Sequence, residues 1–282
     1  DRGISRPAGD GCPHEHPVST LRERGIRRSG RRALLGRRAL TCERRFADRK
    51  RVRLDQARVC RADVAGFVQL FARLPGTKGR EGVTCFLIDT GTPGYGVVRS
   101  IATIAGTEPC ELVFDNCRVH KSQVLGQVGN GWALNQAWLG ARRFQVGIHA
   151  HGMAQRVLRA VADAIREDAQ EVNKYAGTIG HFLGELEALK TLTYTASWRA
   201  DQKLDVRVDA AKVKLFGTEL AHKVIDFALE AVGPTAMRKQ HVIARAFRHA
   251  RARRIVEGPS EVQRHIIQRA LFREGAGLLD LQ

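Results

Sequence analysis

The sequence predicts an α+β protein, in which a partial antiparallel β-domain precedes a C-terminal up-and-down four-helix bundle. Two patterns support this class: short strand-like runs bounded by glycine and proline fill residues 65–119, and apolar residues recur every three or four positions beyond residue 131. With 282 residues, of which 43% are hydrophobic, the chain can bury a sizeable core. We place the domains at residues 1–61, 62–128 and 129–282.

The first segment, residues 1–61, shows neither pattern. It holds 18 Lys and Arg against 7 Asp and Glu, in a chain whose net charge is +18. Such a segment can contact phosphates, but Phe46 is its only aromatic residue for stacking on bases. We interpret it as an arginine-rich disordered arm, or as aberrant sequence from a shifted reading frame, and rank nucleic-acid binding below both.

The β-domain is predicted from runs rich in β-branched and aromatic residues with turn residues between them. The expected strands are 66–72, 82–88, 97–98 and 111–114. Glycine clusters at 91–96 and 126–131 lack the strand–GxGxxG–helix order of a dinucleotide-binding fingerprint, so we interpret both as turns.

The helices follow from apolar residues that share one face. We expect helices at 132–167, with a potential break at Gly140, around 182–196, at 209–232 and after Pro259. The third is expected to stop at Gly233-Pro234, and the last closes a roughly antiparallel bundle.

Composition narrows the class of protein. No apolar run approaches the ~18 residues of a membrane span, and the first residues contain no apolar stretch of a secretory signal, so we expect a cytoplasmic protein. Six scattered cysteines without a CxxC pair indicate reduced thiols. We predict no metal site and interpret the short cluster Cys12, His14 and His16 as incidental.

The main candidate for chemistry lies in residues 251–264. Gly258-Pro259 predicts a helix start, because proline loses nothing at the first helical position, and Glu261 then complements the helix dipole in the first turn. Glu257 is therefore expected just outside the helix N-terminus, on a sharply bent loop. The nearby unpaired N–H groups suit anionic or carbonyl oxygens of a cofactor. A helix-capping role is the alternative that these residues leave open.

Ile255-Val-Glu257-Gly258-Pro-Ser-Glu-Val-Gln263-Arg264 resembles the final signature of acyl-CoA dehydrogenases, hydrophobic-Glu-Gly-Thr-x-x-x-Gln-Arg. Ile88-Asp-Thr-Gly-Thr-Pro93-Gly94 resembles the D…TPG turn of the middle domain of that family. Leu112-Val-Phe-Asp115, followed by Gly129-Asn-Gly131-Trp132, is similar to the exit into the helical domain. The resemblance covers about residues 65–272, the back half of a family member.

The resemblance implies FAD-dependent α,β-dehydrogenation of an acyl-CoA thioester, with Glu257 as the base that removes the α-proton. Its implied partners are an acyl-CoA, an electron-transfer flavoprotein or similar acceptor, and further copies of the chain in a homodimer or homotetramer. It also implies that Arg143 binds substrate. The positions that match cofactor-binding residues are Gly233, Pro259, Ser260 and Glu261.

Three departures from the family pattern affect the flavin site. The Gln-x-x-Gly-Gly-x-Gly loop reads Glu230-Ala-Val-Gly233-Pro234-Thr-Ala236. The arginine that pairs with the FAD pyrophosphate reads Asp168, an acid that would repel it, and Pro259 has no N–H to offer. We therefore expect weak or no flavin binding by this chain alone. The alternative functions are a catalytically impaired protein that uses its bundle for oligomerisation, and a nucleic-acid-associated family member.

Overall fold

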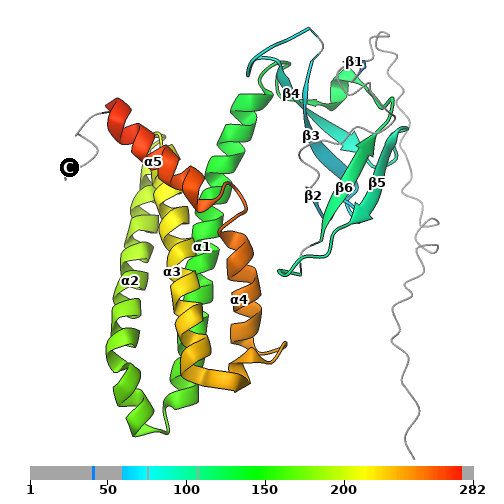
Figure 1. The fold of residues 1–282 in the computed structure, drawn as a ribbon. Coiled ribbons are helices and arrows are strands. Elements are labelled where there is room, and N and C mark those ends of the chain that lie inside the picture. Colours follow the sequence, from blue (N-terminus) through cyan, green and yellow to red (C-terminus); the bar gives the residue numbers. More distant parts are fainter. Residues whose placement is uncertain (1–39, 42–58, 75, 107, 275–282) are drawn as a thin grey trace, which may run out of the picture. The chain divides into compact units, whose positions relative to one another are not determined.

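The computed structural model describes residues 40–41, 59–74, 76–106 and 108–274 (Figure 1). A boundary at residue 37 divides the chain into two units, and the described elements all belong to the second, residues 38–282. The described residues leave out the first unit and most of the predicted arginine-rich segment. They therefore also leave out the cluster Cys12, His14 and His16. The predicted domain boundaries at residues 61 and 128 stay predictions.

The strands form antiparallel sheets, which confirms the predicted partial β-domain. One three-stranded sheet has the order β3-β4-β8, another has the order β2-β6-β5, and β1 pairs with β7. The bounds are β1 Leu40–Thr41, β2 Val59–Cys60, β3 Phe67–Arg73, β4 Val83–Asp89, β5 Tyr95–Ser100, β6 Pro109–Phe114, β7 Arg118–Val119 and β8 Val124–Leu125. A 3₁₀ turn, η1 (Lys121–Gln123), precedes β8.

The β-domain has its own apolar core. Strands β3 and β4 pair from Phe67↔Asp89 to Arg73↔Val83, so alternate residues of each strand share one face. The buried members Val68, Leu70, Phe86 and Ile88 of this hairpin join Leu112 and Phe114 of β6 in one cluster. The four described cysteines, Cys60, Cys85, Cys110 and Cys117, are free thiols.

Beyond β8 the described chain is helical. The bounds are α1 Gly131–Ile165, α2 Ala169–Asp201, α3 Arg207–Val232, η2 Gly233–Met237, α4 Val242–Arg253 and α5 Ser260–Glu274. Helix α1 is continuous through Gly140, so the potential break does not occur. The short helix α4, which packs against α1 and α3 (Figure 1), was not predicted. Its buried residues are Ile243 and three alanines, so small side chains make up most of its buried face, and the helix also contains four arginines.

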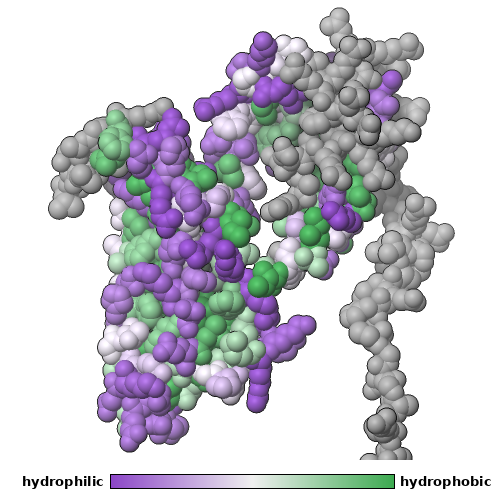
Figure 2. Space-filling model, in the orientation of Figure 1, coloured by the Kyte–Doolittle hydropathy of each residue, from purple (hydrophilic) through white to green (hydrophobic). Residues whose placement is uncertain are grey.

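The helical core lies between α1, α2, α3 and α4, with members such as Val157, Leu189 and Val224 fully buried. Figure 2 shows hydrophilic side chains over much of the visible face of these helices, with apolar residues between them. No helix in the described ranges combines the length and hydropathy that crossing a bilayer requires.

Helices α1 and α3 approach closely at Gly147 and Gly217. A Cβ atom on Gly147 would lie 2.6 Å from Val213 Cγ1, and one on Gly217 would lie 2.9 Å from the Gly147 carbonyl oxygen. Any larger residue would therefore push the helices apart. Arg143 on α1 and Lys214 on α3 each lie about one turn before these glycines, so the crossing brings both side chains to the same end of the bundle.

We expect Gly147→Ala to lower the free energy of unfolding by about 1–3 kcal/mol, because overpacking outweighs the gain of about 1 kcal/mol in helix propensity. Urea denaturation measures the change. The matched control is Gly180→Ala on α2, where a Cβ atom meets nothing within 4 Å, and this variant should be neutral or slightly more stable. Equal stabilities for the two variants would contradict a tight crossing.

Candidate active site

The loop between α4 and α5 contains a sharp backbone turn at Glu257 and Gly258. Their φ angles are 56° and 90°, both in the left-handed region. Glycine adopts such angles freely, but a glutamate does so at a cost of about 1–3 kcal/mol and remains there only when its surroundings hold it. The turn at which the sequence placed Glu257 is therefore present, and Glu257 itself carries the strained conformation.

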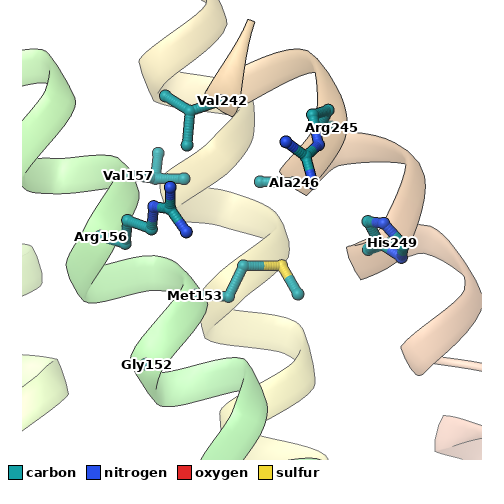
Figure 3. Close-up of a pocket in the computed structure, with 8 residues that line it drawn as sticks. All are labelled: Gly152, Met153, Arg156, Val157, Val242, Arg245, Ala246 and His249. Atoms are coloured by element: carbon teal, nitrogen blue, oxygen red, sulfur yellow. The ribbon is translucent and has the colours of Figure 1, made fainter. Parts of the chain in front are cut away.

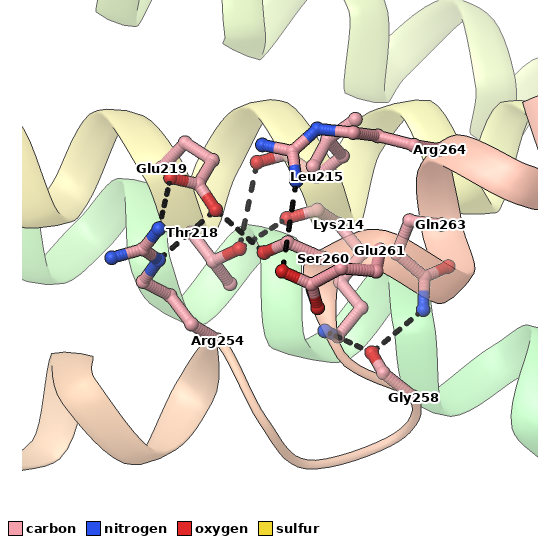
Figure 4. Close-up of polar contacts among 10 residues, drawn as sticks. All are labelled: Lys214, Leu215, Thr218, Glu219, Arg254, Gly258, Ser260, Glu261, Gln263 and Arg264. Carbon is pink, nitrogen blue, oxygen red and sulfur yellow. Dashed lines mark hydrogen bonds and ion pairs between the residues drawn. The ribbon is translucent and has the colours of Figure 1, made fainter.

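Side chains from three helices hold the two carbonyl groups of this turn. Lys214 Nζ on α3 donates to the Gly258 oxygen at 2.6 Å. Gln263 Nε2 on α5 donates to the Gly258 oxygen at 2.7 Å (Figure 4). The same Gln263 nitrogen donates to the Glu257 oxygen at 3.3 Å. Arg143 Nε on α1 donates to the Glu257 oxygen at 3.4 Å. The structure thus brings Arg143 and Glu257 together, as two of the residues that the resemblance singled out.

The Glu257 carboxylate is held by Arg142. This arginine is the chain neighbour of Arg143, the residue that the resemblance selected for substrate binding. Arg142 Nε lies 3.3 Å from Glu257 Oε1, and the Glu257 side chain is 14% exposed. The Arg142 guanidinium also lies over the ring of Trp138, 5.7 Å from its centroid. Glu257 Oε2 has no polar partner among the described residues. One carboxylate oxygen is therefore oriented by a guanidinium group, and the other makes no polar contact within the described part of the chain.

Positive charge surrounds this carboxylate. Burial lowers the pKa of Lys214 to about 8, with Arg143 adding to the effect, although Glu257, Glu219 and Glu261 act in the opposite direction. Burial likewise lowers the pKa values of Arg143 and Arg253, and the charge of Glu257 partly offsets it in both. Such a site attracts anionic groups, including the phosphates of a cofactor or substrate.

A second cluster ties both ends of the loop to α3 (Figure 4). Ser260 Oγ donates to Glu219 Oε1 at 2.5 Å, and Arg254 contacts Glu219 through Nε at 3.0 Å and Nη2 at 2.8 Å. Burial acts to raise the pKa of Glu219, but the hydrogen bonds from Ser260 and Arg254 outweigh it and leave that pKa lowered. Because the Ser260 hydroxyl is used here, a cofactor contact from Ser260 would come from its backbone N–H.

The other predicted cofactor residues lie at the start of α5 and at the far end of α3. The Pro259 oxygen accepts from the N–H groups of Val262 at 2.9 Å and Gln263 at 3.1 Å. Helix α5 therefore begins after Pro259, as predicted, with the proline just before its first residue instead of at it. Glu261 lies in the first turn, as predicted, and its side chain is exposed. Gly233 ends α3 with φ 69°, about 28 Å along the helix from Lys214, and is not brought to this loop within one chain.

Asp168, which stands where the resemblance places a pyrophosphate-binding arginine, has a local structural role. It is the N-cap of α2, and its Oδ1 accepts hydrogen bonds from the N–H groups of Gln170 at 2.9 Å and Glu171 at 3.2 Å. A short acidic side chain at this position satisfies donors that the helix leaves unpaired. The carboxylate is thus committed to its own helix.

Among the cavities lined by described residues, two lie elsewhere in the bundle, and Glu257 lines neither of these. One of about 380 Å³ lies between α1 and α2. The other, of about 310 Å³, lies between α1 and α4, where Met153, Arg156 and Val157 face α4 residues across the gap (Figure 3). Within the described ranges, no group of three or more His, Cys, Asp and Glu side chains could hold a metal ion.

We expect Ser260→Ala to lower the free energy of unfolding by about 1–3 kcal/mol at neutral pH, because it removes a hydrogen bond to a charged acceptor. The lowered pKa of Glu219 means that this stability is present above the ordinary carboxyl pKa and is lost as the pH falls through the folded-state value. Urea midpoints of the two proteins should therefore converge at acidic pH.

Ser197→Ala serves as the control for this pH dependence. Ser197 Oγ donates to the Thr193 carbonyl oxygen, an acceptor that does not titrate, at 2.9 Å. Its effect on stability should be the same at both pH values, and a Ser260→Ala effect that also stays constant would show that Glu219 is not the group involved.

Comparison with known proteins gives one family. The family model described as Acyl-CoA dehydrogenase, C-terminal domain, matches residues 129–272, about half of the chain. An (R)-benzylsuccinyl-CoA dehydrogenase of Thauera aromatica is 31% identical over 202 residues, which cover 68% of this chain and 49% of that protein. An acryloyl-CoA reductase (NADH) of Anaerotignum propionicum is 29% identical over 217 residues, which cover 74% of this chain and 55% of that protein.

Solved structures show the same fold. Butyryl-CoA dehydrogenase from Megasphaera elsdenii has a TM-score of 0.72 at 24% identity, with coverage of 79% of this chain and 60% of that one. PigA with FAD and proline also has a TM-score of 0.72, at 25% identity, with coverage of 77% and 58%. The chain thus spans about half the length of the relatives it matches in sequence.

Proposed function

Since the chain belongs to the acyl-CoA dehydrogenase family, we propose that it carries out flavin-dependent α,β-dehydrogenation of an acyl-CoA thioester with Glu257 as the base. The observation that carries the proposal is the Glu257 carboxylate, oriented by Arg142 through one oxygen at a strained turn while the other oxygen has no polar partner among the described residues. Strained backbone of this kind is concentrated at functional sites.

The proposed reaction breaks one C–H bond at each of two neighbouring carbon atoms. The α C–H bond breaks and its proton passes to Glu257 Oε2, while the β-hydrogen leaves with its electron pair and a carbon–carbon double bond forms. FAD, when bound, supplies the acceptor for that hydride. Arg142 keeps Oε1 in place, so the proton acceptor has a fixed direction.

The start of α5 supports a flavin contact. Ser260 and Glu261 are its first residues, and the first N–H groups of a helix have no intrahelical acceptor, so they can donate to carbonyl oxygens of a bound flavin. Pro259 provides only a carbonyl, which α5 already uses. We propose that Gly233, which lies far from this loop in its own chain, contacts the cofactor of a neighbouring copy.

The proposed partners follow from the same function. They are an acyl-CoA, with Arg143 as the substrate-binding arginine, and an electron-transfer flavoprotein or similar acceptor. Exposed apolar residues on α2, Leu183 at 53%, Tyr194 at 66% and Trp198 at 60% exposure, support association into a homodimer or homotetramer.

We expect Glu257→Gln to lower the rate of acyl-CoA oxidation by at least about 10²–10⁴-fold, because the amide cannot accept the α-proton. The measurement is bleaching of the visible flavin spectrum after an acyl-CoA is added to the FAD-loaded chain. Flavin binding, measured from the same spectrum before substrate is added, should survive because the amide preserves the shape of the side chain.

Glu187→Gln on α2, an exposed site with the same chemical change, should leave the rate of bleaching unaltered. If the flavin spectrum of Glu257→Gln bleached as fast as that of the wild type, the assignment of Glu257 as the base would be wrong. A wild-type chain that takes up no FAD would instead favour the non-catalytic alternative, a bundle used for oligomerisation.

A further inference from the structure

We propose that Lys214 is a positioning residue for Glu257, which fixes the Glu257–Gly258 turn through the hydrogen bond from its ammonium group to the Gly258 carbonyl oxygen. The catalytic consequence rests on the proposed function, whereas the effect on the turn does not. Lys214 touches the loop backbone and is distinct from the residues that contact the Glu257 carboxylate.

The burial of Lys214 is the first argument. Its side chain is fully buried, and among the described residues its one polar contact is the 2.6 Å bond to a neutral carbonyl oxygen. A buried ammonium group without a carboxylate partner destabilises the fold, and an apolar side chain of similar length would avoid that cost. Fold stability therefore does not account for a lysine at this position, but a requirement for a strong donor under the loop does.

The second argument is the geometry of the turn. The Glu257 oxygen belongs to the peptide group before Gly258, and the Gly258 oxygen belongs to the peptide group after it. Gln263 donates to both, Arg143 donates to the first and Lys214 donates to the second. Both peptide planes are thus fixed from outside the loop. Without Lys214, the second plane depends on Gln263 alone, next to a glutamate whose φ of 56° favours relaxation.

The third argument is that Lys214 itself has little freedom to move. It lies on α3 one turn before Gly217, where α3 meets α1 without space for a Cβ atom. The lysine stem is therefore supported by the tightest part of the bundle and projects to the loop from a rigid element. A donor fixed in this way can impose a position on a flexible turn.

The proton of Lys214 should make the turn sensitive to pH. Burial and Arg143 on α1 favour its loss, while Glu257 of the loop, Glu219 of α3 and Glu261 of α5 favour its retention, and the resulting pKa is about 8. A neutral amine is a weaker donor than an ammonium group. The turn should therefore loosen as the pH rises through about 8.

The test measures hydrogen exchange of the backbone amides of residues 255–258 in the full chain, divided by their intrinsic rates at each pH. Lys214→Met removes the donor, Lys214→Gln retains a neutral donor, and Lys223→Met, at an exposed site on the same helix, is the control. We expect about tenfold loss of protection in Lys214→Met and a smaller loss in Lys214→Gln. Lys223→Met should leave protection unchanged.

A second readout separates positioning from general stability. In the FAD-loaded chain, kcat for acyl-CoA oxidation should fall about 10–100-fold in Lys214→Met while KM changes little, because misdirection of the base affects the chemical step. Wild-type kcat should also decline as the pH rises through about 8, and Lys214→Gln should lack this decline. If Lys214 had only a structural role, the pH dependence of kcat would be the same in wild type and Lys214→Gln.

Equal exchange in Lys214→Met and Lys223→Met would overturn the proposal, whether or not the chain is active. If Lys214→Met does not fold, two other measurements decide. The proposal would be overturned if the wild-type turn kept the same protection from exchange on both sides of pH 8 and Lys214→Gln showed unchanged protection. Loosened exchange in a chain that oxidises no acyl-CoA would support the contact to the turn and overturn the proposed function instead.

Discussion

The close contact of α1 with α3 at Gly147 and Gly217 is the constraint on which the rest of the site depends. Two helices that meet without an intervening Cβ atom leave almost no freedom in their relative position. Arg142 and Arg143 on one helix and Lys214 on the other are therefore fixed with respect to each other. The loop at Glu257 is then attached to a preformed set of donors.

The loop itself has little stabilisation of its own. A glutamate and a glycine with positive φ angles form a turn that no helix or strand hydrogen bonds support, and side chains on α1, α3 and α5 supply the missing bonds. Glu219, Arg254 and Ser260 hold the two ends. This arrangement combines a backbone that would relax in isolation with surroundings that prevent relaxation, as expected where a side chain must point in one direction.

The departures from the family pattern have different physical consequences. Asp168 caps α2, so an acid at this position contributes to the bundle even though it supplies no cation for a pyrophosphate. Pro259 gives up an N–H group but supplies the carbonyl at which α5 begins. Positive charge is instead gathered around Glu257, where Arg142, Arg143, Lys214 and Arg253 lie.

The sequence by itself determined the local features: the main strands, the three long helices and the turn at Gly258 follow from spacing and turn chemistry within a few residues. Glu257 as the candidate base rests on the resemblance of its segment to the family signature. The sequence did not indicate α4, whose buried face consists mostly of alanines. It also left out Arg142, Lys214 and Glu219. Their partners lie 35 to 115 positions away in the chain, and only the packing of the helices brings them together.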